Sequence, residues 1–561
     1  MTGLQRVSIP PLKGWQFRRT FKRLFSERAN GTSFRVSGVL AAILATAVPS
    51  AIAQSILLAG GTVADGTGGP LREADLLIEN GTITFIGDAD EVGVSAERSI
   101  DVSGLVVAPG FIDPHTHALS DLSDIRDPQR RQNANYLYQG VTTVMVGNDG
   151  AGPFDVERVG ETLDNIGIGT NAGLLVGLGP VREAVIGKAD RVPTPDELME
   201  MMALVRKAMR EGALGFSTGL YYAPQSFAST EEVIALASVA AKYGGLYDTH
   251  IRDESTYSIG LLASIDEAIN IGRSAAMPVH IAHVKALGPD VWGASNEIIR
   301  KIEAARNDGV DVTADQYPWL ASGTRISNAL FPRWALDGGI EELRRRLKEP
   351  ETRAKLKAEL VENLRRRAGA DALLLTAPLE EAPAGWRGQT LAEVANRQNA
   401  EPVDVVMSLM ERGDYRVASF IMSNEDVLRL ADQDWIMTGS DGTTGHPRKY
   451  GSFPKAYEEL VEKHGLLNLP QFVRRSSARA ADAFGLHKRG YLKEGFVADV
   501  LVLDPEEYKS RASYQNPERL ATGVIHLFVN GRPTIEHSAL TGEFAGRVLR
   551  RKTDQTDGRG Q

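Results

Sequence analysis

Residues 110–117 read Gly-Phe-Ile-Asp-Pro-His-Thr-His, a short apolar run that ends in two histidines one residue apart. Such a run is typical of a buried strand in a parallel sheet. Successive side chains of a strand point to opposite faces, so His115 and His117 point the same way and both imidazoles can reach one cation. The stretch therefore predicts a strand that ends in a metal site.

Seven further apolar runs follow along the chain, at 141–148, 172–178, 214–218, 246–251, 279–284, 310–317 and 435–440. Helical patterns separate them, for example at 193–211, 229–243 and 295–307. Eight strands that are each followed by a helix make a (β/α)8 barrel, the TIM barrel of the α/β class. The interval before the eighth strand is long, and we expect an insertion at about 323–430 that contains a basic helical segment at 341–367.

Short β-type segments joined by Gly-rich turns lie on both sides of this alternating region. They are found at 56–65, 75–78 and 82–86, and again at 499–503, 524–529 and 532–535. We expect the two sets to form one small discontinuous β-sandwich domain, with its first part at 54–108 and its second part at 486–551. The barrel domain is then expected at 109–485, and residues 552–561 are expected to be a disordered tail.

The composition excludes several classes of protein. The chain has 561 residues and no cysteine, which rules out cysteine-based zinc fingers, iron–sulfur clusters and thiol nucleophiles. Residues 1–53 carry eight Lys or Arg against one Glu, yet the whole chain has a net charge of −9, so the part after residue 53 is strongly acidic. Because an acidic body repels a phosphate backbone, we expect no nucleic acid among the partners.

Residues 1–53 have the features of a secretory signal peptide. A basic segment precedes the uncharged run 36–48, and Ala51-Ile52-Ala53 has the small-x-small form of a cleavage site before Gln54. The run is too short to span a bilayer, so no stable membrane span is expected after its removal. We expect export to a periplasm, by the Sec route or, given Arg18-Arg19, the twin-arginine route.

Ligand-type side chains recur where the predicted strands end, which in such a barrel is the face that carries the active site. Asp149 follows the second strand, His250 and His283 end the fifth and sixth strands, and Asp441 ends the eighth. With His115 and His117, four of the ten histidines of the chain fall at strand ends. Imidazole and carboxylate ligands suit zinc or a similar divalent ion.

Longer sequence motifs narrow the choice of protein family. They are Gly212–Pro224 (GALGFSTGLYYAP), Thr249–Glu254 (THIRDE), Gly439–Gly442 (GSDG), Tyr317-Pro318 and His446-Pro447-Arg448. The distribution His-x-His, His, His, Asp around a barrel resembles that of the amidohydrolase superfamily. Within it, the strings are similar to those of the N-acyl-D-amino-acid deacylase (D-aminoacylase) family, and the resemblance extends over about residues 56–551.

This resemblance implies a role for each candidate residue. His250 and His283 would hold a tightly bound metal together with Asp149, while His115 and His117 would form a second site. One or two divalent ions are therefore expected, with zinc as the first choice. Asp441 would act as general base and then as general acid. Arg448, with Lys285, Tyr317 and Ser322, would recognise the substrate carboxylate and the developing oxyanion.

Two positions depart from the family pattern. The family usually has Cys where this chain has Asp149, and the thiolate is a metal ligand there. A carboxylate can also bind or bridge divalent ions but is a harder ligand, and Asn148-Asp149-Gly150 equally suits a simple turn. Leu178 stands where the family often has His, which affects the substrate pocket rather than the chemistry.

Two other features have more than one interpretation in the sequence. Strand parity points His280 away from His283, so a core or interface role is expected for it. The segment Arg252-Asp253-Glu254 follows His250 and suits either a structural ion pair or a substrate contact.

We expect an exported metal-dependent amidohydrolase that hydrolyses N-acyl-D-amino acids, or dipeptides with D residues, to a carboxylate and an amino acid. A cyclic-amide hydrolase of the hydantoinase or dihydroorotase type is the alternative. Those relatives commonly carry a carboxylated Lys on strand four, where this chain has Phe216-Ser217-Thr218. Another carboxypeptidase-like amidohydrolase also stays open, whereas the complete metal-residue set disfavours a non-catalytic scaffold. The expected partner is a small N-acyl amino acid or dipeptide, and the oligomeric state, a homo-oligomer included, is left open.

Overall fold

The computed structural model describes residues 55–551. The predicted signal peptide at 1–53 and the predicted tail at 552–561 lie outside the described residues. Within the described range, no helix is long and apolar enough to cross a membrane.

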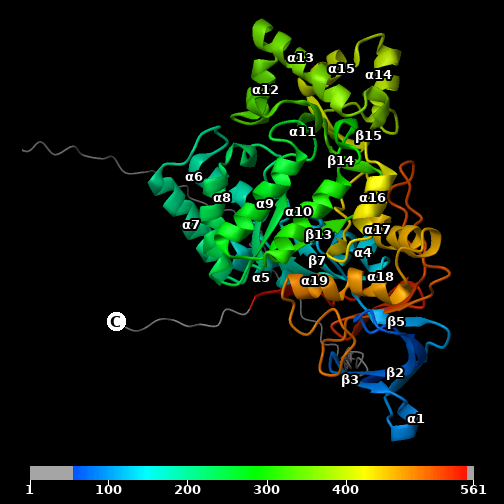
Figure 1. Ribbon diagram of the computed structural model, residues 1–561. Helices are drawn as coiled ribbons and strands as arrows, with labels where there is room; N and C mark the ends of the chain where they lie inside the picture. Colours follow the sequence, from blue (N-terminus) through cyan, green and yellow to red (C-terminus); the bar gives the residue numbers. More distant parts are fainter. Residues whose placement is uncertain (1–54, 552–561) are drawn as a thin grey trace, which may run out of the picture. The chain divides into compact units, whose positions relative to one another are not determined.

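Eight parallel strands form the barrel (Figure 1). They are β6 (Phe111–Asp113), β7 (Val141–Val146), β8 (Asn171–Leu174) with its continuation β9 (Val176–Gly177), β10 (Gly215–Gly219), β11 (Leu246–His250), β12 (Val279–Ile281), β13 (Val312–Gln316) and β17 (Ile436–Thr438). Each strand pairs in parallel with the next. A parallel bridge between Thr116 and Gly442 joins the first strand to the last and closes the ring. The predicted TIM barrel is confirmed.

Some of the helices between these strands begin at a residue whose side chain caps the first turn. At the start of α7 (Pro195–Arg210), the Thr194 hydroxyl accepts a hydrogen bond from the Glu197 N–H, and the Glu197 carboxylate accepts one from the Thr194 N–H. This exchange satisfies N–H groups that the first turn of a helix leaves free. The other helices of the barrel region are α2 (Leu119–Leu122), α3 (Pro128–Gln132), α4 (Ala134–Leu137), α5 (Val156–Ile166), α6 (Leu178–Ile186), α8 (Thr230–Ala241), α9 (Leu261–Ala275), α10 (Ser295–Asn307), α16 (Asn424–Ala431), α17 (Arg448–Tyr457), α18 (Leu469–Ser476) and α19 (Ala478–Ala483).

The apolar faces of strands and helices share one continuous core. It includes Phe216 and Tyr247 from neighbouring strands, with ring centroids 6.3 Å apart, and Val205 and Leu236 from the helices outside. Burial of apolar surface contributes about 25 cal/mol per Å². Close packing of this kind keeps the strand ends, and the polar groups that follow them, in fixed relative positions.

Both ends of the described chain enter one mixed sheet, as the β-sandwich prediction requires. From the first part come β1 (Ser55–Val63), β2 (Arg72–Glu79), β3 (Thr82–Gly87), β4 (Arg98–Asp101) and β5 (Val106–Pro109), with the short helix α1 (Ala89–Val92). From the second come β18 (Val500–Leu503), β19 (Val524–Val529), β20 (Arg532–Glu536) and β21 (Ala539–Leu540). Antiparallel pairing of β5 with β18 joins the two sets. A last strand, β22 (Val548–Leu549), returns to the barrel and pairs with β8.

The interval before the eighth strand forms a separate packing unit. It contains the antiparallel strands β14 (Ala321–Arg325), β15 (Leu373–Glu380) and β16 (Gly413–Phe420), with helices α11 (Ile326–Leu330), α12 (Ile340–Arg346), α13 (Pro350–Arg366), α14 (Leu391–Gln398) and α15 (Pro402–Met410). These elements share their own apolar core. The basic segment expected at 341–367 is two helices rather than one, because Pro350 lacks a backbone N–H and begins a new helix.

A buried ion pair ties together two barrel helices. The Arg182 guanidinium of α6 lies 2.5 Å and 2.6 Å from the two carboxylate oxygens of Glu232 in α8, and both side chains are almost completely buried. Replacing one partner would leave the other charge buried without a counter-ion.

We expect Glu232→Gln to lower the free energy of unfolding by about 3–5 kcal/mol. The measurement is chemical and thermal unfolding against the wild type. Glu297→Gln is the matched control, since it breaks a pair with Arg300 in which both side chains are at least half exposed. An equally small change in both variants would contradict a structural role for the Arg182–Glu232 pair.

Candidate metal centre

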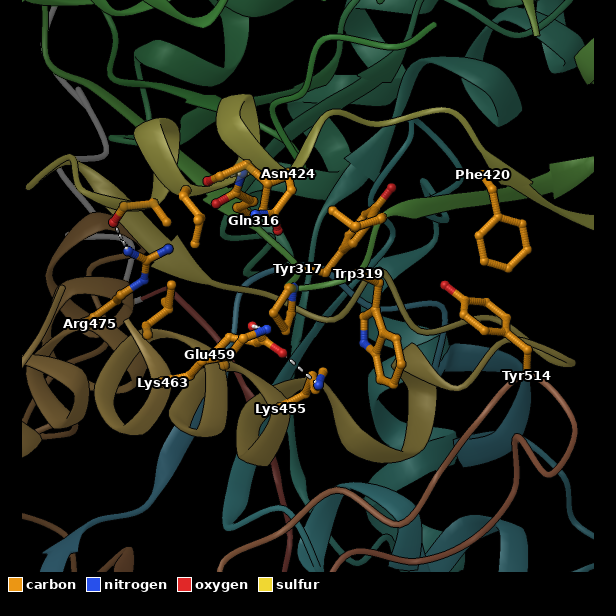
Figure 2. A pocket seen from close by; sticks show the side chains of 17 residues that line it. Gln316, Tyr317, Trp319, Phe420, Asn424, Lys455, Glu459, Lys463, Arg475 and Tyr514 are labelled. Carbon is orange, nitrogen blue, oxygen red and sulfur yellow. Dashed lines mark hydrogen bonds and ion pairs between the residues drawn. The ribbon is translucent and has the colours of Figure 1, made fainter. Parts of the chain in front are cut away.

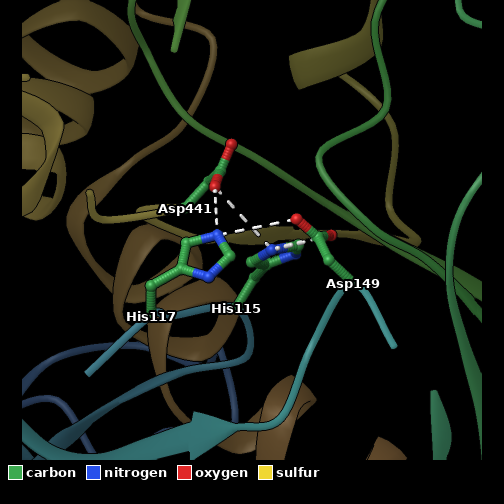
Figure 3. A group of neighbouring side chains, drawn as sticks. All are labelled: His115, His117, Asp149 and Asp441. Carbon is green, nitrogen blue, oxygen red and sulfur yellow. Dashed lines mark hydrogen bonds and ion pairs between the residues drawn. The ribbon is translucent and has the colours of Figure 1, made fainter. Parts of the chain in front are cut away.

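Six candidate ligands meet where the barrel strands end, and we call this group the metal centre. His115 and His117 follow β6, Asp149 follows β7, His250 is the last residue of β11, His283 follows β12 and Asp441 follows β17. Two sets of ligand atoms lie within 4.8 Å of one another: His115, His117, Asp149 and Asp441, and Asp149, His250 and His283. Figure 3 shows the first set, with its side chains pointing toward one another.

Asp149 belongs to both sets because its two oxygens face different imidazoles. Oδ1 lies 3.4 Å from His115 Nε2, 3.5 Å from His250 Nδ1 and 3.6 Å from His283 Nε2. Oδ2 lies 3.6 Å from His117 Nε2. Ligand atoms held at about 2.0–2.1 Å by a tetrahedral ion are about 3.3–3.4 Å apart. The carboxylate is therefore a candidate ligand common to both sets.

The backbone at Asp149 explains why a turn and a ligand coincide here. Its φ is +56°, a left-handed conformation that Asp and Asn adopt more readily than most residues. The Asp149 carbonyl accepts a hydrogen bond from the Gln225 amide. The two interpretations of Asn148-Asp149-Gly150 are thus compatible: a turn forms, and it aims the carboxylate at the histidines.

The donor atoms of the metal centre fit a divalent cation. His115 Nε2, His250 Nδ1 and Asp149 Oδ1 are sealed from solvent, and none has a hydrogen-bond partner. Buried polar atoms are normally hydrogen-bonded, and imidazole nitrogens and carboxylates are the oxygen and nitrogen ligands that zinc takes in proteins. Ligation by a cation would satisfy all three atoms at once.

An ion pair behind the histidines holds two of them in place. Lys285 Nζ lies 2.8 Å from His283 Nδ1 and pairs with Glu254, whose Oε1 lies 3.3 Å from the same ring nitrogen. The other Glu254 oxygen lies 3.6 Å from His250 Nε2. Burial raises the pKa of Glu254, but Lys285 and the imidazoles outweigh it and hold the pKa below its usual range. Lys285, expected at the substrate, therefore contacts a candidate ligand directly.

A second support lies deeper in the barrel. Asp315 of β13 is completely buried, with Oδ2 at 3.7 Å from His115 Nδ1 and 2.9 Å from His280 Nε2. His280 also contacts the Thr313 hydroxyl at 3.0 Å. The core role expected for His280 agrees with this position, since its ring lies against Asp315 rather than against the metal centre.

The candidate base Asp441 is paired with an arginine. Arg448 Nη1 lies 2.8 Å from Asp441 Oδ2, and Asp441 Oδ1 lies 3.1 Å from His117 Nε2. Burial raises the pKa of Asp441, but the Arg448 guanidinium and the imidazoles hold it below its usual range. The carboxyl is therefore ionised, as a general base must be.

The other predicted substrate residues surround Arg448. Its guanidinium lies 4.9 Å from the centre of the Tyr317 ring, and its Nη2 donates a hydrogen bond to the Gly323 carbonyl at 3.2 Å. The hydroxyls of Tyr317 and Ser322 are buried without a hydrogen-bond partner. Both hydroxyls are thus free to donate to a substrate oxygen.

Several contacts of this site were not expected from the sequence. The rings of Tyr221 and Tyr222 pack against His250, with centroids 5.4 Å and 4.7 Å away, although both lie in the quoted string 212–224. Arg252 pairs with Glu267 at 2.8 Å and donates to two backbone carbonyls. Of the two expected roles, a structural ion pair or a substrate contact, its side chain therefore has the first. The position of Glu254, four residues after His250, could have indicated a contact between the two. Its pairing with Lys285 depends on the tertiary structure.

The barrel and this donor set define a metal-dependent amidohydrolase. The chain belongs to the amidohydrolase family, whose profile matches residues 98–535. It is 34% identical to D-aminoacylase of Alcaligenes xylosoxydans xylosoxydans over 523 residues, which are 88% of this chain and 97% of the relative.

Two solved structures are similar over nearly their whole length. One is a D-aminoacylase studied for the role of its binuclear metal centre, 32% identical with a TM-score of 0.75 over 88% of this chain and 99% of that chain. The other is N-acyl-D-glutamate deacylase from Bordetella bronchiseptica, in complex with zinc and a phosphonate that mimics the tetrahedral intermediate. It is 30% identical, with the same TM-score and the same coverage.

The shared position of Asp149 makes a prediction about metal content. We expect Asp149→Asn to weaken the binding of both ions by at least about ten-fold, because even partners outside the ligand set are worth about 10–100-fold in affinity. His117→Asn is expected to weaken one ion only. The measurement is metal per chain by elemental analysis after dialysis against buffered zinc.

His464→Asn is the control for this experiment, since His464 lies 3.6 Å from Glu459 and belongs to neither set of candidate ligands. It should keep the wild-type metal content. Full occupancy at wild-type affinity in Asp149→Asn would mean that Asp149 serves only as a turn residue.

Proposed function

We propose that this amidohydrolase cleaves the amide bond of N-acyl-D-amino acids, releasing a carboxylate and a D-amino acid. The observation that carries the proposal is the position of Asp441. Its carboxylate pairs with Arg448 and contacts His117 in the metal centre. The names and phosphonate ligand of the similar proteins support the substrate class. Dipeptides with a D residue present the same amide and carboxylate and are the second substrate to test.

Asp441 can carry both proton transfers of the reaction. A bound divalent ion would be held by His115, His117, Asp149, His250 and His283, and it would polarise the amide carbonyl and lower the pKa of water. Asp441 accepts the proton of the attacking water as the C–O bond forms. It then donates this proton to the amide nitrogen as the C–N bond breaks. The Tyr317 hydroxyl can donate a hydrogen bond to the oxyanion.

Arg448 has two tasks in this scheme. Its Nη1 keeps Asp441 charged, and the rest of its planar fork can bind the substrate carboxylate with two N–H groups. The free hydroxyl of Ser322 lies on the same strand as Gly323, whose carbonyl Arg448 contacts. Lys285 would act through His283 and Glu254, which it contacts.

A cyclic-amide hydrolase is the less favoured function. The fourth strand, β10, has the sequence GFSTG and offers no Lys to bridge two ions. Asp149, which follows the second strand, belongs to both sets of candidate ligands and would be the shared carboxylate. We propose zinc as the physiological metal because imidazole and carboxylate ligands suit it and one similar protein holds it.

The experiment is a substrate panel. We expect hydrolysis of N-acetyl-D-amino acids with kcat/KM well above that of their L enantiomers, and little turnover of hydantoin or dihydroorotate. The readout is amine release in zinc-loaded enzyme. Faster turnover of the cyclic amides would contradict the proposal and favour the alternative.

Asp441→Asn tests the mechanism on the best substrate from this panel. Loss of a general acid–base group is expected to lower kcat by about 10²–10⁴-fold. Asp308→Asn is the matched control, an exposed aspartate paired with Arg273, and should leave kcat unchanged. Wild-type turnover by Asp441→Asn would exclude it as the proton carrier.

We further propose that the protein is exported with cleavage before Gln54. The basic segment, the uncharged run 36–48 and the Ala51-Ile52-Ala53 site support this. Mass spectrometry of the periplasmic fraction should find a chain that begins at Gln54. An intact Met1 start in the cytosolic fraction would contradict export.

A further inference from the structure

A cavity lies behind the segment that follows β13. It measures about 320 Å³, within the range of about 300–1,000 Å³ that is usual for ligand pockets. Residues of α16, α17 and the adjoining helical turn Glu458–Lys463 form its wall, together with Tyr317 and Trp319 (Figure 2). None of the six residues of the metal centre lines it.

Most of this wall is apolar. Trp319, Phe420, Val427, Leu428, Leu460 and Tyr514 contribute to it. Phe420 is 43% exposed and Leu320 39% exposed, so the cavity opens to solvent beside them. An open apolar cavity gains free energy when an apolar chain displaces its water.

Arg475 of α18 places a buried positive charge at one end. It is only 4% exposed, and Figure 2 shows it opposite the end formed by Phe420 and Tyr514. Its Nη1 donates to the Ala431 carbonyl, while its Nε is buried without a partner. Among residues 55–551, no carboxylate forms an ion pair with it within 4 Å.

A buried guanidinium without a counter-ion is unfavourable. Its burial lowers the pKa of Arg475 to about 9. Asp315 and Asp432 offset the penalty in part from beyond 4 Å, and an anion in direct contact with the guanidinium would relieve more of it.

The remaining charges of the wall also favour an anion. Glu459 pairs with Lys455 at 2.8 Å and with Lys463 at 3.0 Å. The lining therefore carries Lys455, Lys463 and Arg475 against one carboxylate, which leaves an excess of positive charge.

We propose that this cavity is a binding site for a small amphipathic carboxylate, separate from the metal centre. The carboxylate pairs with Arg475, and the apolar chain runs along Trp319 toward Phe420. A free medium-chain acid has this chemistry. It is also the acyl product that an N-acyl substrate with such a chain would release, but the site does not depend on the proposed reaction.

The experiment is calorimetric titration of the metal-loaded enzyme with acetate, butyrate, hexanoate and octanoate. Affinity should rise by up to about four-fold for each added CH2, because each buried CH2 contributes about 0.8 kcal/mol. Octyltrimethylammonium and 1-octanol should bind at least ten-fold more weakly than octanoate. Equal affinity for the anion and the cation would overturn the assignment of Arg475.

Three variants test whether octanoate binds in this cavity. Arg475→Gln should weaken octanoate by about 10–100-fold, the loss expected for a hydrogen bond to a charged group. Arg474→Gln changes the neighbouring exposed arginine and should leave affinity unchanged. Ala456→Leu places a larger side chain in the cavity from its buried wall. It should abolish the increase of affinity with the length of the acid, which gives a test independent of Arg475→Gln.

The metal centre can also bind carboxylates, and chelation separates the two sites. Octanoate binding that depends on Arg475 should survive metal removal and should survive Asp441→Asn. Loss of octanoate binding on chelation, with wild-type affinity in Arg475→Gln and Ala456→Leu, would place it at the metal centre and overturn the proposal. Failure of the enzyme to hydrolyse N-acyl amino acids would leave this result unaffected.

Discussion

The arrangement of the catalytic face depends on one carboxylate that four imidazoles share. Asp149 Oδ1 faces His115, His250 and His283, and its Oδ2 faces His117. These ligands come from four different strand ends, so their meeting requires the closed parallel ring. Donor atoms so close together and so well buried are stable only when a positive charge lies among them.

Charged partners behind the ligands balance this concentration of donors. Lys285 and Glu254 support His283 and His250, Asp315 supports His115, and Arg448 faces Asp441. Asp315 comes from a strand other than that of His115, whereas Glu254, Lys285 and Arg448 follow the residues that they contact or their neighbours within a few positions of the same strand end. The barrel thus fixes both the ligands and the groups that set their orientation, as metal sites generally require.

Much of the fold was predictable, because strands and capped helices are local. The runs at 141–148 and 246–251 contain β7 and β11, and α10 has the expected bounds of 295–307. The segment 341–367 was expected as one helical segment, and Pro350 divides it. The pairings of Arg252 with Glu267 and of Glu254 with Lys285 could not be deduced, because they join residues whose distance depends on how helices and loops pack.

The sequence by itself determined which donors exist and at which strand ends they lie. With no cysteine in the chain, a thiolate is excluded at the position after the second strand, and Asp149 offers a carboxylate there. Only the tertiary structure decided that Asp149 faces both sets of histidines, that Arg448 pairs with Asp441 and that Arg475 lines a cavity without an ion-pair partner within 4 Å among residues 55–551. The reason is physical: residue type and local periodicity are properties of neighbouring residues, whereas charge pairing and cavities arise where distant segments pack.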